Sequence, residues 1–341
     1  MSGAAVAAVA GAGGGILAQV VTYPLQTVNT RQQTERKLLR LPDADVTPSE
    51  ASKTTLQQFI KIINEEGPSS LYQGLGSSIV GTALSQGIYY GVYQMGRDWA
   101  TNKNKKSIGT LTSLAVAALS GCVNVLLTTP IWVVVTRLQT EKQARKAKLR
   151  RLSEAAGRYE LETGVRDRSF VEKPVTTAGA VAEMYKEAGL LGFWKGVLPA
   201  LIMVSNPAIQ FMIYEALLER LTAKRRLNKA GFKNISASEV FMLGSVAKLG
   251  ATLVTYPLLV IKSRLQAKQD IGTDDSLQYT GTLDAVAKMV KHEGFLSFYK
   301  GMDLKIVQSV LAAAILFMTK EELVKLAFVL LRSNKGRKLP A

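Results

Sequence analysis

Lys248 is the residue whose setting in the sequence most clearly predicts a chemical role. It is the only charged side chain in an otherwise uncharged, apolar run from Val240 to Ile261. An ammonium group at membrane depth is costly unless it faces a polar space and meets an anion. We therefore expect Lys248 to bind an anionic group such as a phosphate. The alternative is a side chain that reaches along the helix to the membrane surface.

Amide side chains recur in the other apolar runs. They donate and accept hydrogen bonds without carrying charge, so they suit sugar hydroxyls and the edges of bases, although they can equally bridge neighbouring helices. We predict that six amides contact solute together with Lys248: Gln19, Gln86, Asn124, Asn206, Gln210 and Gln308.

The supply of reactive residues argues against several other functions. Cys122 is the only cysteine and His292 the only histidine, so a disulfide within the chain and a zinc site built from cysteine and histidine are excluded. No nucleophile with a neighbouring base is placed within the apolar runs. We expect no catalytic residues, no metal and no cofactor, and therefore not an enzyme.

The elements that must position these side chains are membrane-spanning helices. Residues 67–96, 107–136 and 196–214 carry no charge at all. Each run approaches or exceeds the roughly 20 residues that a helix needs to cross a bilayer. With the runs before Arg31, around Lys248 and from residue 306 onward, the sequence predicts an all-α membrane protein with six transmembrane helices.

The chain is strongly basic, with 43 Lys and Arg against 26 Asp and Glu and a net charge of +17. Basic loops beside membrane spans are ordinary, and they attract anionic lipid head groups. The insertion at 141–173 contains six basic residues between Lys142 and Arg151 without an acid, in what reads as a long connection. We expect membrane lipids rather than nucleic acid as the partner of these charges, and assign the insertion no further role.

One pattern occurs three times along the chain. Each copy reads P-x(6)-R-x-Q at the end of an apolar run, at 24–33, 130–139 and 257–266. Each is followed by a glutamate and an aromatic-x-Gly element, at 66–74, 187–196 and 293–301. Three copies in the same register predict tandem helix-loop-helix repeats, which we place at 1–105, 106–230 and 231–341.

Within each repeat a short amphipathic segment precedes the aromatic-x-Gly element. Apolar residues recur there at helical spacing beside charges, at 56–64, 178–186 and 283–292. These segments should lie along the membrane surface. The prolines at equivalent depth in three spans should bring three helices together at one end, around a central cavity with pseudo-threefold symmetry.

These motifs resemble the mitochondrial carrier family, whose signature is P-x-[DE]-x-x-[KR]-x-[KR]-x-Q followed by an acidic-Gly and an aromatic-basic-Gly element. The resemblance covers nearly the whole chain. Residues 130–132, 205–211 and 311–314 are similar to the branch that carries NAD, folate, FAD and pyrimidine nucleotides. Residues 13–36 are most similar to the peroxisomal NAD-carrying members. The family implies transport by alternating access between two gates.

The resemblance implies a monomeric carrier that exchanges NAD for AMP or ADP, and carries CoA, across the peroxisomal membrane. Two alternatives remain open. One is a carrier of folate, FAD or pyrimidine nucleotides in the mitochondrial inner membrane. The other is a scaffold that kept the carrier fold and lost transport.

Both gates depart from the family pattern. At the first gate the acidic positions hold Gln26, Trp132 and Leu259, so no carboxylate remains. The basic positions hold Asn29, Val135 and Lys262, and the family pairing would leave a cation–π contact between Trp132 and Lys262. The second gate keeps one full ion pair among its residues Gln94, Arg97, Glu215 and Glu321, namely Arg97 with Glu321. We expect a weak first gate and hence loose exchange or some one-way flux.

Helical spacing relative to these gate positions indicates the cavity face. Lys248 lies eleven residues before Leu259, and Gln19 lies seven before Gln26, so each pair shares a face. Gln308 stands where the family often has an arginine. An amide there disfavours a simple carboxylate as substrate, because carboxylates are best held by a bidentate arginine.

Overall fold

The computed structural model describes residues 3–35, 55–104, 109–163, 176–227, 236–267 and 278–335. Within these ranges the regular structure is helical and no strand occurs. The predicted boundaries between repeats, at 105/106 and 230/231, lie outside the described residues. They stay predictions.

Three successive units share one order of elements. The first contains α1 (Gly3–Thr34), α3 (Thr55–Glu66), η2 (Pro68–Tyr72) and α4 (Leu75–Asn104). The second contains α5 (Thr110–Thr163), α6 (Thr177–Ala188), η3 (Leu190–Trp194), α7 (Val197–Ile202), η4 (Met203–Ser205) and α8 (Asn206–Leu227). The third contains α9 (Ala237–Gln266), α10 (Thr282–Glu293), η6 (Phe295–Tyr299) and α11 (Met302–Lys335). The short helices α3, α6 and α10 enclose the three predicted amphipathic segments.

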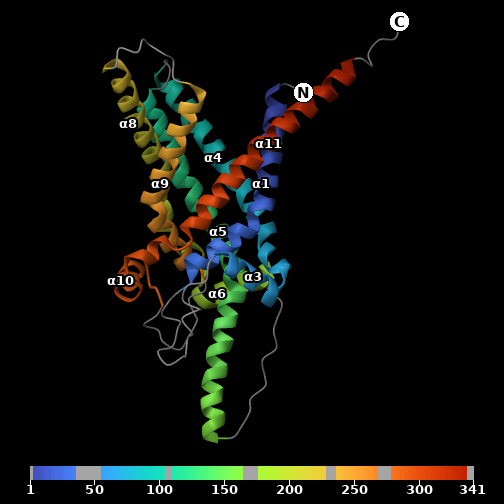
Figure 1. Ribbon diagram of the computed structural model, residues 1–341, viewed down its shortest axis with the longest axis vertical. Helices are drawn as coiled ribbons and strands as arrows, with labels where there is room; N and C mark the ends of the chain where they lie inside the picture. The colour runs from blue at the N-terminus through green and yellow to red at the C-terminus, as the bar shows by residue number, and fades with distance from the viewer. Residues whose placement is uncertain are drawn as a thin grey trace.

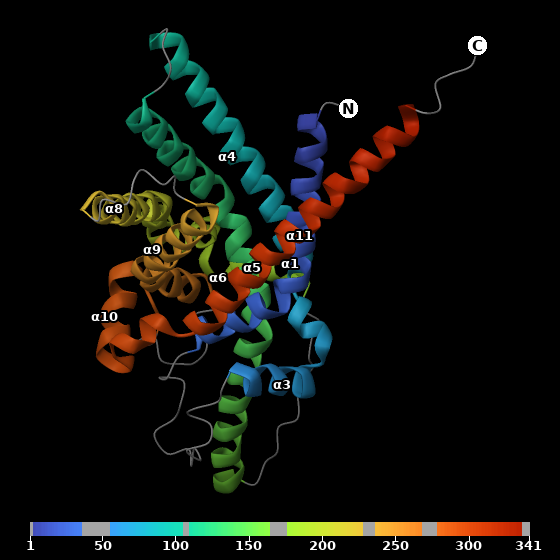
Figure 2. The ribbon, with the colours of Figure 1, turned by 45° about the horizontal axis from the view of Figure 1, so that its top comes forward.

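The long helices pack around one another in a bundle whose two ends differ (Figure 1). α1 packs along α11, α4 along α5 and α8 along α9, while α1, α5 and α9 contact one another in all three pairs. Figure 1 and Figure 2 show the long helices close together near α3, α6 and α10 and spread apart at the other end. We call these the closed end and the open end. The three proline-containing helices therefore converge as predicted.

Helix α5 departs from its counterparts. α1 ends at Thr34, one residue after the glutamine of its motif, and α9 ends at Gln266, the glutamine itself. α5 instead continues to Thr163. It projects beyond the closed end as a single long helix (Figure 1). The segment from Lys142 to Arg151, which the sequence placed in a long connection, is thus part of a helix.

Hydropathy and exposure fit a membrane-embedded bundle. Three stretches of the described chain are long and apolar enough to cross a membrane by length and composition: Thr112–Ala144, Leu190–Arg225 and Ser238–Gln266. Large apolar side chains such as Leu119, Met212 and Phe241 are exposed on the bundle. In water such a surface would be an aggregation hazard, but lipid tails solvate it.

A tryptophan compensates for the proline in α5. Pro130 has no N–H, so the carbonyl of Leu126, four residues earlier, lacks its usual helical donor. The Nε1 of Trp194, the aromatic residue of the aromatic-x-Gly element, donates to this carbonyl at 2.9 Å. The unit's second motif therefore satisfies the backbone group that its first motif leaves free.

Three glycines hold the units together in a cycle at the closed end. Gly74, Gly196 and Gly301 all have a positive φ, between 77° and 83°. A Cβ atom added at any of the three would press on the proline-containing helix of the next unit. At Gly74 it would lie 3.2 Å from the Cβ of Leu138, and at Gly196 it would lie 3.2 Å from the carbonyl oxygen of Lys262. At Gly301 it would lie 2.9 Å from the Nδ2 of Asn29. Each unit thus presses a glycine turn onto the proline-containing helix of the next, and glycine suits both the conformation and the space.

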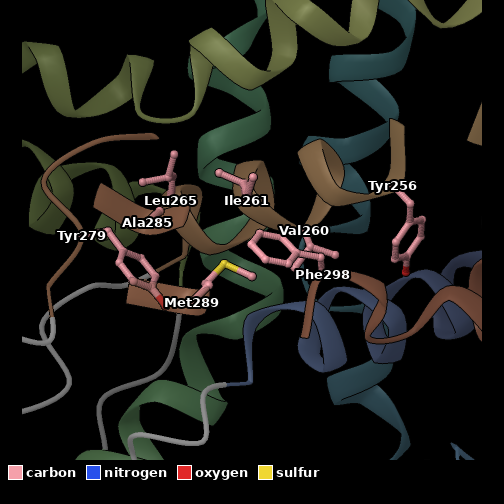
Figure 3. Packing of buried hydrophobic residues seen from close by; sticks show 8 residues of the cluster. All are labelled: Tyr256, Val260, Ile261, Leu265, Tyr279, Ala285, Met289 and Phe298. Atoms are coloured by element: carbon pink, nitrogen blue, oxygen red, sulfur yellow. The ribbon is translucent and has the colours of Figure 1, made fainter. Parts of the chain in front are cut away.

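The surface helices are fixed to this end by apolar packing. In the third unit, α10 presents Ala285 and Met289, four residues apart on one helical face, to the last turns of α9. Figure 3 shows the side chains of this cluster between α9 and the chain from α10 to η6: Tyr256, Val260, Ile261, Leu265, Tyr279, Ala285, Met289 and Phe298.

We predict that Gly74→Ala weakens the closed end. The substitution places a side chain at positive φ and against Leu138, which together cost on the order of 1–3 kcal/mol, so the apparent melting temperature of the purified protein should fall. At Gly76, two residues later in α4, a Cβ atom would have no neighbour within 4 Å. Gly76→Ala should leave the melting temperature unchanged or raise it, and equal effects of the two substitutions would contradict this account.

Candidate functional site

Buried arginine–glutamate pairs join the proline-containing helices to the surface helices. The two NH groups of Arg31 each lie 3.0 Å from an oxygen of Glu66, and those of Arg264 lie 2.6 and 2.9 Å from the oxygens of Glu293. Arg137 also pairs with Glu187. Each arginine is that of P-x(6)-R-x-Q, and each glutamate opens the downstream motif of the same unit. The repeat that was visible in sequence is therefore a repeated ion pair.

Two of the arginines also reach into the next unit. The Nε of Arg31 donates to the carbonyl of Gln139 at 3.0 Å, and the Nε of Arg264 donates to the carbonyl of Gln33 at 2.9 Å. These bonds connect the first unit to the second and the third to the first. One arginine thus binds its own surface helix and the neighbouring unit at once.

The seam between the second and third units is built differently. The Nε of Arg137 makes no hydrogen bond to any described residue and lies 3.5 Å from Glu141, one turn further along the continuous helix α5. The seam is joined instead by the hydroxyl of Thr136, which donates to the Oε1 of Gln266 at 3.2 Å. Within the described chain, the ring of arginine-to-carbonyl bonds is therefore made at two of its three seams.

Polar side chains, rather than ion pairs, occupy the first gate between α1 and α9. Asn29 donates to the carbonyl of Gly301 and accepts from the Nε2 of Gln33 at 2.7 Å. Gln33 also donates to the hydroxyl of Tyr256 at 3.1 Å, and its Oε1 accepts from Ser263 at 2.8 Å. Sequence reasoning identified Asn29 but missed the other three. The motif itself carried a signal for Gln33 and Ser263. Each copy has a hydroxyl residue directly before its arginine and a glutamine two residues after it.

The remaining residues of the predicted first gate lie close by. Trp132 turns toward α4, where its Cζ2 lies 3.8 Å from the position of a Cβ at Gly81. The backbone carbonyl of Lys262 lies against the glycine turn at Gly196. Gln26 is half-buried one turn before Asn29. The cation–π contact between Trp132 and Lys262 stays a prediction.

The second gate lies where the helices spread apart. Gln94 donates to Asp98 of its own helix at 2.9 Å, and Arg97 and Glu215 are exposed. The side chain of Glu321 lies outside the described part of the chain, so its pairing with Arg97 stays a prediction. The structure therefore presents a bundle that is joined at the proline end and spread at the other.

Three of the predicted solute-binding amides bridge helices in this conformation. Gln19 donates to Ser78 at 2.8 Å between α1 and α4, and Asn124 donates to Ser85 at 3.0 Å between α5 and α4. Asn206 donates to Thr255 at 2.8 Å between α8 and α9. Amides in membrane bundles often take this structural role. Whether these three also contact solute stays a prediction.

The other predicted residues retain capacity for a ligand. Gln86 and Lys248 are exposed, and Gln210 is half-buried. Gln308 is only 8% exposed and accepts a hydrogen bond from the Nζ of Lys305 at 3.1 Å. Sequence reasoning did not single out Lys305, although it stands one helical turn before Gln308 on α11.

Comparison with known proteins agrees with this architecture. The sequence profile described as mitochondrial carrier protein matches residues 2–104, 106–225 and 233–329. The chain belongs to the mitochondrial carrier family. The carrier is 52% identical to the peroxisomal nicotinamide adenine dinucleotide carrier of Arabidopsis thaliana, over 97% of its own length and 98% of the relative's.

More distant relatives have a similar extent. The carrier is 33% identical to the peroxisomal membrane protein PMP34 of Mus musculus, over 95% of its own length and 94% of the relative's. It is 29% identical to the mitochondrial nicotinamide adenine dinucleotide transporter 2 of Arabidopsis thaliana, over 94% and 79% of the two chains. The family and these relatives indicate a transporter rather than an enzyme.

The charged network at the closed end affects the ionisation of Glu293, which lies on the surface helix α10. Burial alone would raise the pKa of Glu293, but hydrogen bonds from Arg264 and the charges of Arg264 and Lys300 bring it below its ordinary value. Burial lowers the pKa of Lys300, and the nearby carboxylate of Glu293 offsets this only in part. A carboxyl group with a lowered pKa in the folded state stabilises the fold above its ordinary pKa and loses that effect as pH falls through the lowered value.

We predict that Glu293→Gln lowers the stability of the carrier at neutral pH by about 3–5 kcal/mol, because it leaves Arg264 buried without its carboxylate. The difference between wild type and variant should shrink as pH falls through the lowered pKa of Glu293, since wild type is then protonated too. Melting temperatures in detergent across this pH range measure both effects. Glu187→Gln is the matched comparison: the Glu187 side chain is 28% exposed where Glu293 is 0% exposed, so its loss should be smaller. A difference that stays constant with pH would contradict the prediction.

Proposed function

We propose that the carrier exchanges NAD for AMP or ADP across the peroxisomal membrane, and that it also accepts CoA. The observation that carries the proposal is Lys248, exposed within the apolar helix α9 and forming no ion pair with any described residue. Such a lysine favours a substrate that brings its own negative charge. NAD, AMP, ADP and CoA all bring phosphate groups.

The polar residues around the bundle fit the rest of such a substrate. Gln86 and Gln210 offer donors and acceptors for ribose hydroxyls and base edges. Gln308, in place of an arginine, provides no bidentate partner for a simple carboxylate. The combination of one cation with several amides therefore suits a nucleotide better than a carboxylic acid.

The relatives support the organelle and the substrate class. The Arabidopsis relative at 52% identity is named as a peroxisomal carrier of nicotinamide adenine dinucleotide, and the mouse relative is named as a peroxisomal membrane protein. A mitochondrial carrier of folate, FAD or pyrimidine nucleotides is the competing assignment. Transport of none of these compounds would leave a scaffold that retained the fold.

Substrate competition in proteoliposomes tests the proposal directly. Purified carrier in liposomes loaded with AMP should take up labelled NAD, and external ADP and CoA should compete, whereas folate and FAD should compete poorly. Stronger competition by folate or FAD would favour the mitochondrial assignment. Absence of any uptake, with protein of native melting temperature, would favour the scaffold.

We predict that Lys248→Gln lowers NAD uptake by roughly 10–100-fold, because it removes one charge-assisted contact to phosphate. The matched control is Lys291→Gln, which makes the same change of charge at an exposed position of the surface helix α10. Lys291→Gln should transport as wild type does. Equal transport by Lys248→Gln and wild type would remove Lys248 from the substrate site.

The polar first gate predicts loose coupling of exchange. Its contacts are neutral hydrogen bonds, and each contributes about 1 kcal/mol net. Ion pairs would be stronger, so a bundle without bound substrate can open this gate more readily than one closed by ion pairs. Liposomes without internal substrate should therefore show NAD uptake above that of protein-free liposomes. Complete dependence on internal AMP or NAD would show that the carrier is a strict exchanger.

A further inference from the structure

Three tyrosines of α4 lie in mutual contact near the middle of the helix. The ring of Tyr89 is parallel to that of Tyr93, with centroids 6.1 Å apart and an angle of 9° between the planes. It meets the ring of Tyr90 edge to face, with centroids 5.6 Å apart. Tyr90 is 64% exposed, whereas Tyr89 and Tyr93 are half-buried. Tyr89 therefore supports both neighbouring rings, and the ring of Tyr90 stays accessible.

One face of α4 is used for packing against α5 (Figure 2). A Cβ atom at Gly81 would lie 2.9 Å from a side chain of α5, and one at Gly96 would lie 2.8 Å from another. Between these glycines, Ser85 accepts a hydrogen bond from Asn124 of α5 at 3.0 Å. At 100° per residue, the three positions on α4 share one face of the helix.

Two further stripes of α4 lie about 100° to either side of this packing face. One is apolar and exposed, and its side chains are Val80, Leu84 and Met95. The other follows the spacing i, i+4, i+7 and i+11 and consists of Gln86, Tyr90, Tyr93 and Arg97. Amide, phenol and guanidinium groups are costly in lipid, because lipid tails offer them no hydrogen bond. The apolar stripe therefore faces lipid, and the second stripe faces the inside of the bundle.

The depth of Tyr90 sets it apart from the tyrosines that anchor spans at a membrane surface. It lies fifteen residues after Leu75, the first residue of α4, and fourteen before Asn104, the last. The cluster is thus centred on the helix and not at either end. A polar, aromatic stripe at this depth requires a partner other than lipid or head groups.

A flat aromatic ring is the partner that these side chains suit. Tyrosine rings stack on the faces of nucleobases with little regard to which base is bound, because every base has such a face. Gln86 stands one helical turn before Tyr90 on the same stripe, and its amide can donate to and accept from the edge of a base. The stripe therefore offers a surface for the face of a base and an amide for its edge.

We propose that Tyr90 and Tyr93 form a stacking platform for the aromatic base of the solute, and that Gln86 binds the edge of that base. This inference rests on the proposed nucleotide transport and refines it, because it identifies where the base is recognised, apart from the phosphate at Lys248. Stacking does not depend on the identity of the base. One platform therefore serves the adenine of AMP, ADP and CoA and both rings of NAD.

AMP and ribose 5-phosphate test the platform, because they share a phosphorylated ribose and differ by the adenine. The purified full-length carrier in detergent is titrated with each compound, and the shift in melting temperature gives the dissociation constant. Wild type should bind AMP at least about tenfold more tightly than ribose 5-phosphate. The double variant Tyr90→Leu, Tyr93→Leu should weaken AMP binding by about tenfold and ribose 5-phosphate binding by less than about twofold, because only the stacking is lost.

Two further variants check that the aromatic ring itself is responsible. Tyr90→Phe keeps the ring and should bind AMP as wild type does. Tyr185→Leu is the matched control, since Tyr185 is 61% exposed on the surface helix α6, and it should also bind AMP as wild type does. Equal binding of AMP and ribose 5-phosphate by wild type overturns the proposal without any variant. So does an unchanged AMP affinity in Tyr90→Leu, whose exposed position lets the variant fold.

The same experiment separates the platform from the proposed transport. A carrier that binds AMP through the tyrosines and moves no NAD refutes the transport proposal alone. A carrier that exchanges NAD, while the double variant leaves NAD uptake and AMP binding unchanged, refutes the platform alone.

Discussion

The buried pairing of arginine with glutamate at the closed end is the interaction on which the rest of the fold depends. A guanidinium and a carboxylate removed from water are tolerated only when nearly every donor finds an acceptor. Arg264 meets this condition with both oxygens of Glu293 and with the carbonyls of Gln33 and Glu35. The surface helix, the proline-containing helix and the neighbouring unit must therefore all be in place together. The glycine turns provide the close approach that this geometry needs.

Much of the fold could be predicted because its signals are local. The three copies of P-x(6)-R-x-Q and the helical spacing of 283–292 need no knowledge of neighbours, and the structure has a helix at Thr282–Glu293. The extension of α5 was missed although its signal is also local. Residues 141–156 contain neither proline nor glycine and are rich in good helix formers, whereas Pro42 follows the first motif and Gly272 the third.

The contacts of the candidate site could be predicted only in part, because they depend on partners from other helices. Spacing placed Gln19 and Lys248 on defined helical faces, but Ser78 as the partner of Gln19 becomes visible only when α1 and α4 are packed. Asn206 likewise meets Thr255 only when α8 and α9 are packed. Residue type thus indicates what a side chain can bind, and packing decides what it does bind.

The unequal seams of the closed end have a mechanical consequence for a carrier that must open there. The first unit is joined to both neighbours by a charge-assisted bond from an arginine to a backbone carbonyl, while the seam between the second and third units has the neutral bond from Thr136 to Gln266. Charge-assisted bonds are roughly twice as strong as neutral ones. At this seam the Nε of Arg137 lies 3.5 Å from Glu141 on the continuation of α5 and has no hydrogen-bond partner among the described residues. Among the hydrogen bonds between described residues of these three helices, separation of α5 from α9 therefore breaks no charge-assisted bond, whereas separation of either helix from α1 breaks one.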